Sequence, residues 1–188
     1  SLTALALDFS GSMDGEGEES LKEAMMQLLD QNLAKNNFLQ ASADDILLVI
    51  PFTSELVWDP PRIVRGNNPG ELNKVLNDIL GLSAGGGTNI YNPVVKAFEE
   101  FARMGEEITQ YLPGVIVMTD GKSDGSIHQI KETWNRLNIN MDMPPVFGIT
   151  FGDADKNQLD EIAHYTSARV FDGSHDLIHA FKKAKGYN

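Results

Sequence analysis

The sequence contains no cysteine, which excludes disulfide bonds, thiolate zinc sites and cysteine nucleophiles. This absence leaves the redox compartment open, because a chain without cysteine is indifferent to it. No run of about 18 consecutive apolar residues is present, so the sequence predicts no membrane-spanning helix. Basic residues are few, since 15 Lys and Arg face 27 Asp and Glu and give a net charge of −12. Such a charge repels phosphate backbones and anionic lipids, so we expect neither nucleic acid nor a membrane as a partner of this domain.

What the sequence does contain is typical of a globular domain. Its 188 residues are enough for one domain with a substantial core, and 41% of them are hydrophobic. The chain starts at Ser1 and continues directly into an apolar segment, without a start methionine, a basic leader or a cleavage site. We therefore expect residues 1–188 to be a single domain taken from a longer protein.

Short apolar segments alternate with longer segments of helical spacing, which is typical of β-α units around a mostly parallel sheet. The predicted strands are residues 2–8, 46–52, 115–119, 146–151 and 168–171. A weaker strand signal, at 56–58 and 62–64, is interrupted by Pro60 and Pro61, and proline favours an edge position. The sequence thus predicts a doubly wound, Rossmann-like α/β fold of three layers: a mostly parallel six-stranded sheet with one antiparallel edge strand and helices on both faces.

Helices are indicated by apolar residues three and four positions apart and by side chains suited to helix ends. One apolar stripe covers residues 21–33 and follows an acidic first turn. Asn68 and Asn92 each precede a proline, and both are predicted to cap a helix. Asp155 and Gln158 resemble a capping box at the start of another helix.

Polar side chains occur where the predicted strands end. In a doubly wound sheet, the loops at the carboxyl ends of the strands converge on one crevice. The candidate metal ligands in these loops are Asp8, Ser10, Ser12, Thr88 and Asp120. Asp8 ends the first predicted strand, and Ser10 and Ser12 follow it. Thr88 follows a run of three glycines, and Asp120 follows the strand at 115–119. This set offers oxygen atoms but no imidazole or thiolate, so it favours Mg²⁺, Mn²⁺ or Ca²⁺ over zinc or copper.

The order of these loops resembles the von Willebrand factor type A (VWA) family and its metal-ion-dependent adhesion site (MIDAS). The resemblance rests on Asp8-x-Ser10-x-Ser12, on Gly85-Gly86-Gly87-Thr88 and on Thr119-Asp120-Gly121. It covers nearly the whole chain. The wider sequence at 8–13, 86–91, 151–154 and 181–188 also resembles bacterial members that form the last domain of exported or membrane-anchored proteins, with a solute-binding-like region upstream. The resemblance therefore implies an extracytoplasmic or cell-surface location. The sequence departs from the pattern at 166–168, where Thr-Ser-Ala stands in place of a threonine and two glycines.

The resemblance also implies a role for each candidate ligand. Ser10 and Ser12 would bind the metal directly, and Thr88 would do so directly or through water. Asp8 and Asp120 would act mainly through bound waters, which leaves one coordination position for an Asp or Glu carboxylate of a protein partner. A divalent cation offsets the two carboxylates of the site, so such a partner can approach despite the acidic surface. In this family, ligand arrival can also displace the last helix, which we expect here at residues 176–185.

One alternative is a calcium-binding loop at residues 8–19, which have oxygen-bearing side chains at most of the required positions. The sixth position of such a loop requires glycine, but Met13 stands there, and a predicted strand rather than a helix precedes the segment. The family motif therefore explains these residues better than a calcium-binding loop does.

The other alternative is a serine hydrolase. Residues 121–125 match the nucleophile-elbow pattern, with Ser123 as the nucleophile. Its candidate partners, in α/β-hydrolase order, are Asp153 or Asp172, followed by His164, His175 or His179. An elbow requires small neighbours, whereas Lys122 and Asp124 flank the serine, and the first loop would stay unexplained. We therefore expect a binding domain without catalytic activity.

Overall fold

The computed structural model describes residues 1–174 and 176–186. Six strands form one sheet in the order β3-β2-β1-β4-β5-β6. The strands are β1 (Leu2–Asp8), β2 (Ile46–Phe52), β3 (Arg62–Arg65), β4 (Pro113–Thr119), β5 (Val146–Thr150) and β6 (Val170–Asp172). The edge strand β3 pairs antiparallel with β2, and the other neighbouring strands pair in parallel. The predicted fold class is therefore confirmed, including the antiparallel edge strand after the proline pair.

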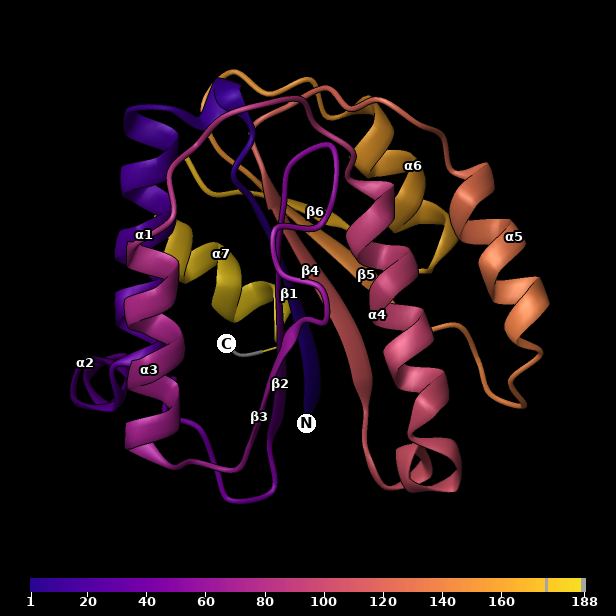
Figure 1. Cartoon of the computed structure of the whole chain (residues 1–188), viewed down its shortest axis with the longest axis horizontal. Coiled ribbons are helices and arrows are strands. Elements are labelled where there is room, and N and C mark those ends of the chain that lie inside the picture. Colours follow the sequence, from indigo (N-terminus) through magenta and orange to yellow (C-terminus); the bar gives the residue numbers. More distant parts are fainter. Residues whose placement is uncertain (175, 187–188) are drawn as a thin grey trace.

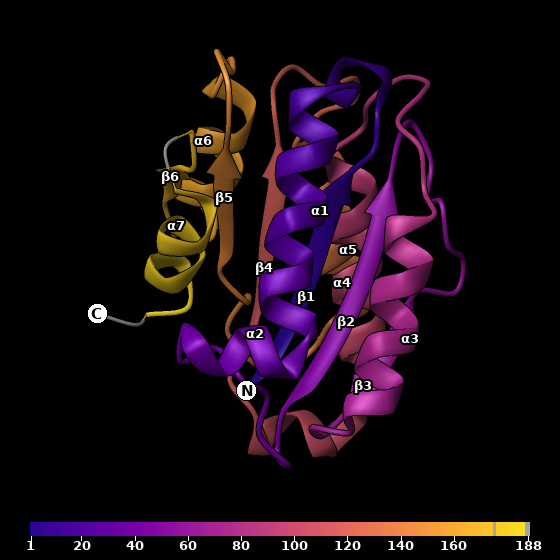
Figure 2. The same ribbon diagram turned by 90° about the vertical axis from the view of Figure 1, so that its left-hand side faces the viewer.

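Helices cover both faces of this sheet. The α-helices are α1 (Glu16–Leu29), α2 (Gln31–Asn36), α3 (Pro69–Leu80), α4 (Tyr91–Arg103), α5 (His128–Leu137), α6 (Asn157–Tyr165) and α7 (Leu177–Ala184), and two short 3₁₀ helices are η1 (Gly11–Met13) and η2 (Gly105–Gln110). Helices α1, α3 and α7 lie on one face, and α4, α5 and α6 lie on the other (Figure 1). The side view shows the same layers, with α1 in front of the central strands (Figure 2). Among the described residues, no helix combines the length and apolar character that crossing a membrane requires.

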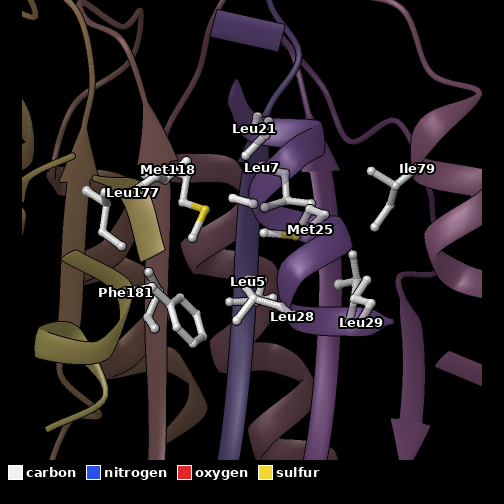
Figure 3. Close-up of a cluster of buried hydrophobic side chains, with 14 of the residues drawn as sticks. Leu5, Leu7, Leu21, Met25, Leu28, Leu29, Ile79, Met118, Leu177 and Phe181 are labelled. Carbon is white, nitrogen blue, oxygen red and sulfur yellow. The ribbon is translucent and has the colours of Figure 1, made fainter. Parts of the chain in front are cut away.

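The central strand β1 is buried on both faces, and its side chains alternate between two apolar layers. Leu5 and Leu7 point to the layer formed with α1 and α7, where Met25 and Phe181 also lie (Figure 3). The alternate positions of β1, Ala4 among them, face the layer formed with α4, α5 and α6. This arrangement explains why the segment reads as a continuous apolar run rather than an alternating one.

The first helical stripe does not form one helix, so that prediction is wrong at its end. Helix α1 ends at Leu29, and α2 begins two residues later. Asp30 adopts an extended backbone, and its Oδ1 accepts hydrogen bonds from the backbone N–H groups of Asn32 (3.0 Å) and Leu33 (3.4 Å). An aspartate that caps a new helix in this way ends the preceding one, although the apolar spacing continues.

The predicted cap at Asn68 is confirmed, since its side chain accepts two backbone hydrogen bonds (2.9 and 3.1 Å) from the first turn of α3. The predicted cap at Asn92 is wrong. Helix α4 begins at Tyr91, and Asn89 Oδ1 accepts from the N–H groups of Tyr91 (2.9 Å) and Asn92 (3.1 Å). Two asparagines compete near this start, and the earlier one precedes the first helical turn, where a cap can act.

Replacing Asn89 with alanine is expected to lower the free energy of unfolding by about 1 kcal/mol, because two N–H groups of α4 lose their acceptor. Asn89→Asp keeps an acceptor at the helix N-terminus, where negative charge is favourable, but loses the donor to Gln129 Oε1 (3.4 Å), so its stability should lie between those of Asn89→Ala and the parent. Urea denaturation of the three proteins without metal measures this difference. Equal stabilities would contradict the capping role of Asn89.

The predicted capping box at Asp155 and Gln158 is only half formed. Asp155 Oδ1 accepts from the N–H of Asn157 (3.0 Å), as a residue before a helix can. The Gln158 amide does not turn back toward the helix start, because it bonds Ser123 in the loop after β4. A tertiary partner has therefore replaced the expected local one.

The remaining boundaries differ from the predictions by one or two residues. Strand β4 begins earlier, at Pro113, β5 ends at Thr150, and β6 is shifted toward Asp172. Of the weak signal at 56–58, only Leu56 forms an isolated bridge, with Phe52. Helix α7 lies within the predicted range, and Asp176 caps it by accepting from His179 N–H (2.9 Å).

The loop that departs from the family pattern, residues 166–168, contains one strained residue. Ser167 has a φ of 61°, in the left-handed region that glycine occupies without cost. The neighbouring Thr166 hydroxyl accepts from the N–H of Val146 (2.9 Å) and thereby ties the loop to the start of β5. The serine thus adopts the backbone conformation for which a glycine is better suited.

Candidate metal centre

The candidate ligands lie at the carboxyl edge of the sheet, at its topological switch point. Asp8 is the last residue of β1, and Asp120 directly follows β4. These two strands are parallel neighbours, and the chain builds the sheet outward from them in opposite directions. The loops after β1 and β4 therefore enclose the crevice in which doubly wound folds bind their ligands.

Asp8 is fully buried, with an exposed fraction of 0%, and both of its carboxylate oxygens accept hydrogen bonds. Ser10 donates its backbone N–H to Oδ1 (2.8 Å), and Thr119 donates its hydroxyl to Oδ2 (2.7 Å). Thr119 was not predicted as a site residue. The available signal was a single hydroxyl at the end of an otherwise apolar strand, next to Asp120.

Ser12 connects the first loop to the loop after β4. Its hydroxyl donates to Asp120 Oδ1 (3.0 Å), although the two residues are 108 positions apart in the sequence. The Ser10 hydroxyl oxygen lies 3.3 Å from the Ser12 hydroxyl oxygen. The structure therefore brings four of the five predicted residues together, with Asp8 joined through the Ser10 backbone.

The glycine-rich loop packs against the first loop through its backbone. Gly11 donates its N–H to Gly86 O (2.9 Å), and Gly85 donates its N–H to Phe9 O (2.9 Å). A Cβ atom at Gly11 would lie 3.2 Å from Gly86 O, closer than such contacts normally are. Gly86 itself has a φ of 81°, which favours glycine. Glycines at both positions thus allow the two backbones to approach.

Thr88 lies in the same loop, two residues after Gly86, and is half-buried. Its backbone oxygen accepts from the N–H of Asp124 (2.8 Å), so this segment is also tied to the loop after β4. In the described part of the chain, the Thr88 hydroxyl makes no hydrogen bond with the other four predicted residues. The backbone of the glycine-rich loop is thus bonded to the first loop and to the loop after β4, whereas the Thr88 side chain is not bonded to the other four predicted residues.

Asp8 and Asp120 place two carboxylates beside each other. Burial raises the pKa of Asp8, and the nearby Asp120 carboxylate raises it further, although hydrogen bonds from Ser10 and Thr119 act in the opposite direction. Within residues 1–174 and 176–186, no ion pair includes Asp8 or Asp120. Buried charges are costly unless they are paired or coordinate a metal.

The donor set at this edge fits a hard divalent cation. Among the described residues, no group of three His, Cys, Asp or Glu side chains is placed to hold a metal ion. A cation at this edge would therefore depend on hydroxyl oxygens together with the two carboxylates. Oxygen donors of this kind suit Mg²⁺, Mn²⁺ and Ca²⁺, and the unpaired buried carboxylate supplies the electrostatic reason for a cation to bind.

The alternative calcium loop is not formed. Residues 8–19 begin in β1, and η1 then places Met13 in the apolar core, fully buried, where a calcium loop needs a sharply turning glycine.

The nucleophile-elbow interpretation is also unsupported. The Ser123 hydroxyl accepts from Ile90 N–H (2.8 Å) and donates to Asp124 O (2.7 Å). Both partners are backbone groups, whereas a catalytic serine would donate to a histidine. Across the described residues, no hydrogen bond joins Ser123 to a histidine. His175 lies outside the described residues, and the other two candidate histidines are exposed on α6 and α7.

The fold and this edge define the class: a doubly wound α/β domain whose switch point has carboxylate and hydroxyl oxygens. A model of the von Willebrand factor type A domain matches residues 4–179, and the chain therefore belongs to that family. Domains of this family are generally metal-dependent adhesion or protein-interaction modules and are generally not enzymes. A comparison with the curated proteins found no match.

Solved structures show the same fold at low sequence identity. A von Willebrand factor type A protein from Catenulispora acidiphila aligns over 98% of this chain and 41% of its own, with a TM-score of 0.67 and 16% identity. The pilus adhesin SpaC from Lactobacillus rhamnosus GG aligns over 98% and 30%, with a TM-score of 0.69 and 13% identity. Proximal thread matrix protein 1 from the mussel byssus, with a zinc-occupied MIDAS motif, aligns over 97% and 43%, with a TM-score of 0.60 and 16% identity. The chain spans less than half the length of each.

Proposed function

We propose that this domain binds one divalent cation through Asp8, Ser10, Ser12, Thr88 and Asp120, and uses it to capture an acidic group of a protein partner. The observation that carries the proposal is the buried Asp8 carboxylate beside Asp120, since no cationic side chain among the described residues forms an ion pair with either. The bound cation would supply a Lewis-acidic point at which a partner's Asp or Glu carboxylate can bind.

The positions of the residues suggest different roles at the metal. The hydroxyls of Ser10 and Ser12 lie in the first loop beside Asp120, which suits them as direct ligands. Both carboxylate oxygens of Asp8 accept hydrogen bonds, from Ser10 N–H and from the Thr119 hydroxyl. These bonds fix the carboxylate beside the site and suit it to act through bound water rather than as a direct ligand. Outer carboxylates of this kind orient ligands and hold bound water.

Mg²⁺ is the cation that we propose first, with Mn²⁺ and Ca²⁺ as substitutes, because the donors are hard oxygen atoms. The zinc in the mussel byssus protein shows that such a motif can hold zinc in that relative. Zn²⁺ is therefore included in the experiment below.

The setting of the domain is part of the proposal. Structural neighbours include a pilus adhesin and a byssus matrix protein, which supports an extracytoplasmic or cell-surface location. We propose that residues 1–188 are one von Willebrand factor type A domain of a longer, bacterial-type protein with a solute-binding-like region upstream.

Calorimetric titration of EDTA-treated protein with each of the four cations tests the metal site. We expect binding at one site, and thermal denaturation should show stabilisation of about 2.7 kcal/mol at a free cation concentration of about 100 Kd. For a chain of this size, that corresponds to a rise in Tm of about 5–11 °C. Absence of binding for all four cations would overturn the proposal.

Capture of a carboxylate is tested separately with immobilised peptide libraries that differ only in Asp and Glu against Asn and Gln. We expect acidic peptides to be retained with Mg²⁺ and released by EDTA. If peptides are retained equally without the cation, or equally when Asn and Gln replace Asp and Glu, the proposed mode of capture is rejected. The proposal of a metal site is not affected by that result.

A further inference from the structure

The loop that follows Asp120 joins the two sides of the candidate metal centre. At its far end, Asp124 donates its N–H to Thr88 O (2.8 Å). One residue earlier, the Ser123 hydroxyl accepts from the N–H of Ile90 (2.8 Å). These bonds attach the loop to the segment that carries Thr88, which is also held by the bond from Asn89 N–H to Thr53 O (2.9 Å). The position of the loop is therefore one of the contacts that fix Thr88.

Gln158, in the first turn of α6, holds this loop from the opposite side. Its Oε1 accepts from Ser123 N–H (2.8 Å), while its Nε2 donates to Ser123 O (2.8 Å) and to the Tyr91 hydroxyl (3.1 Å). A primary amide has one acceptor oxygen and two N–H donors, so both donors and the acceptor are engaged. One side chain thereby satisfies both backbone groups of Ser123.

The loop has little space in which to relax toward another position. Gly125 has a φ of 84°, and a Cβ atom there would overlap Gln129 Oε1 and lie 3.0 Å from Tyr91 Cδ2. The backbone at Gly125 therefore packs closely against α4 and α5. We therefore expect the loss of the Gln158 hydrogen bonds to affect the bonds that the same loop makes with Ile90 and Thr88.

We propose that Gln158 is a positioning residue for the metal centre, because by fixing Ser123 it sets the place of Thr88 relative to Asp120. This inference rests on the proposed function. In the described part of the chain, Gln158 makes no hydrogen bond with the five proposed ligands and acts through Ser123. Without the amide, the Ser123 N–H and C=O lose their partners, and the loop that bonds the Thr88 segment loses one of its supports.

The first test is the substitution Gln158→Met, which keeps the length of the side chain and removes all three hydrogen bonds. We expect the affinity for Mn²⁺, measured by calorimetry, to fall about 10-fold, the lower end of the range for loss of a group that orients a metal ligand, because Gln158 acts through Ser123. Gln110→Met is the matched control, since Gln110 is exposed in η2, and its affinity should equal that of the parent.

The second test asks whether Gln158 acts through Thr88. In a Thr88→Ala background, Gln158→Met should change the affinity by less than about 2-fold, because the side chain that it positions is absent. A full, multiplicative loss in that background would overturn the inference. Thermal denaturation without metal is measured in parallel, and a lowered Tm with unchanged affinity would show a purely structural role and also overturn it.

Ser123→Ala tests the contact between Ser123 and the Thr88 segment, and it replaces Gln158→Met as the test if that variant does not fold. It removes the acceptor of Ile90 N–H but keeps the backbone bonds to Gln158, and we expect a loss of affinity of about 10-fold. Parental affinity in both variants would reject the inference while the proposed function stands. Failure of the parent to bind any cation would instead reject the proposed function itself.

Discussion

Replacing Asp8 with asparagine is expected to lower the affinity for Mg²⁺ by about 10- to 100-fold. Asparagine has nearly the same shape and retains an oxygen that can accept from Ser10 N–H. Its amide can donate to the Thr119 hydroxyl, so the buried hydrogen bonds are replaced rather than lost. The negative charge, however, is gone, and with it the main attraction for a cation.

The same substitution should not destabilise the metal-free protein above the acidic range. The folded pKa of Asp8 is raised, so between its ordinary pKa and this raised pKa the folded chain binds more protons than the unfolded chain. The contribution of Asp8 to the free energy of unfolding therefore falls as the pH rises through that window. Asp8→Asn removes this penalty, so its stability relative to the parent should increase with pH in EDTA.

Asp142→Asn is the matched control, because Asp142 is exposed and precedes β5, at the edge of the sheet opposite the candidate metal centre. We expect metal affinity within about 2-fold of the parent. Calorimetry measures the affinities, and urea denaturation in EDTA measures the stabilities. Equal affinities of Asp8→Asn and the parent would show that Asp8 does not contribute to the metal centre.

Replacing Phe98 with alanine is expected to lower the free energy of unfolding by about 3–5 kcal/mol. Phe98, on α4, is 0% exposed and packs edge-to-face against Trp134 of α5, with ring centroids 5.3 Å apart. Its removal leaves a cavity between these helices and the sheet. Since a typical domain is stable by about 5–15 kcal/mol, this is a large fraction of the total.

Phe38→Ala is the control for the Phe98 variant, because it deletes the same atoms from a ring that is 85% exposed. Its effect should stay within about 0.5 kcal/mol. For Phe98→Ala, thermal denaturation should show a fall in Tm of about 6–20 °C. Similar losses in both variants would contradict the assignment of Phe98 to the core.

Strands were predicted well because their signal is local. Residues 2–8 and 46–52 form β1 and β2 with the predicted bounds, since strands covered on both faces have apolar side chains throughout. The proline pair at 60 and 61 likewise indicated the edge strand. Helix ends were predicted less well, as at Asn92, because neighbouring asparagines can each cap a helix and packing selects one.

The fold class and the set of candidate ligands could be predicted from the amino-acid order alone, because the spacing of apolar residues and the polar residues at strand ends are properties of short segments. That Asp8 and the other candidates bind a cation stays a prediction. Three contacts became visible only in the folded chain: Thr119 bonds Asp8, Gln158 bonds Ser123, and the glycine-rich loop bonds the first loop. Those contacts join residues distant in the chain, and their geometry depends on how the layers pack, which no local pattern encodes.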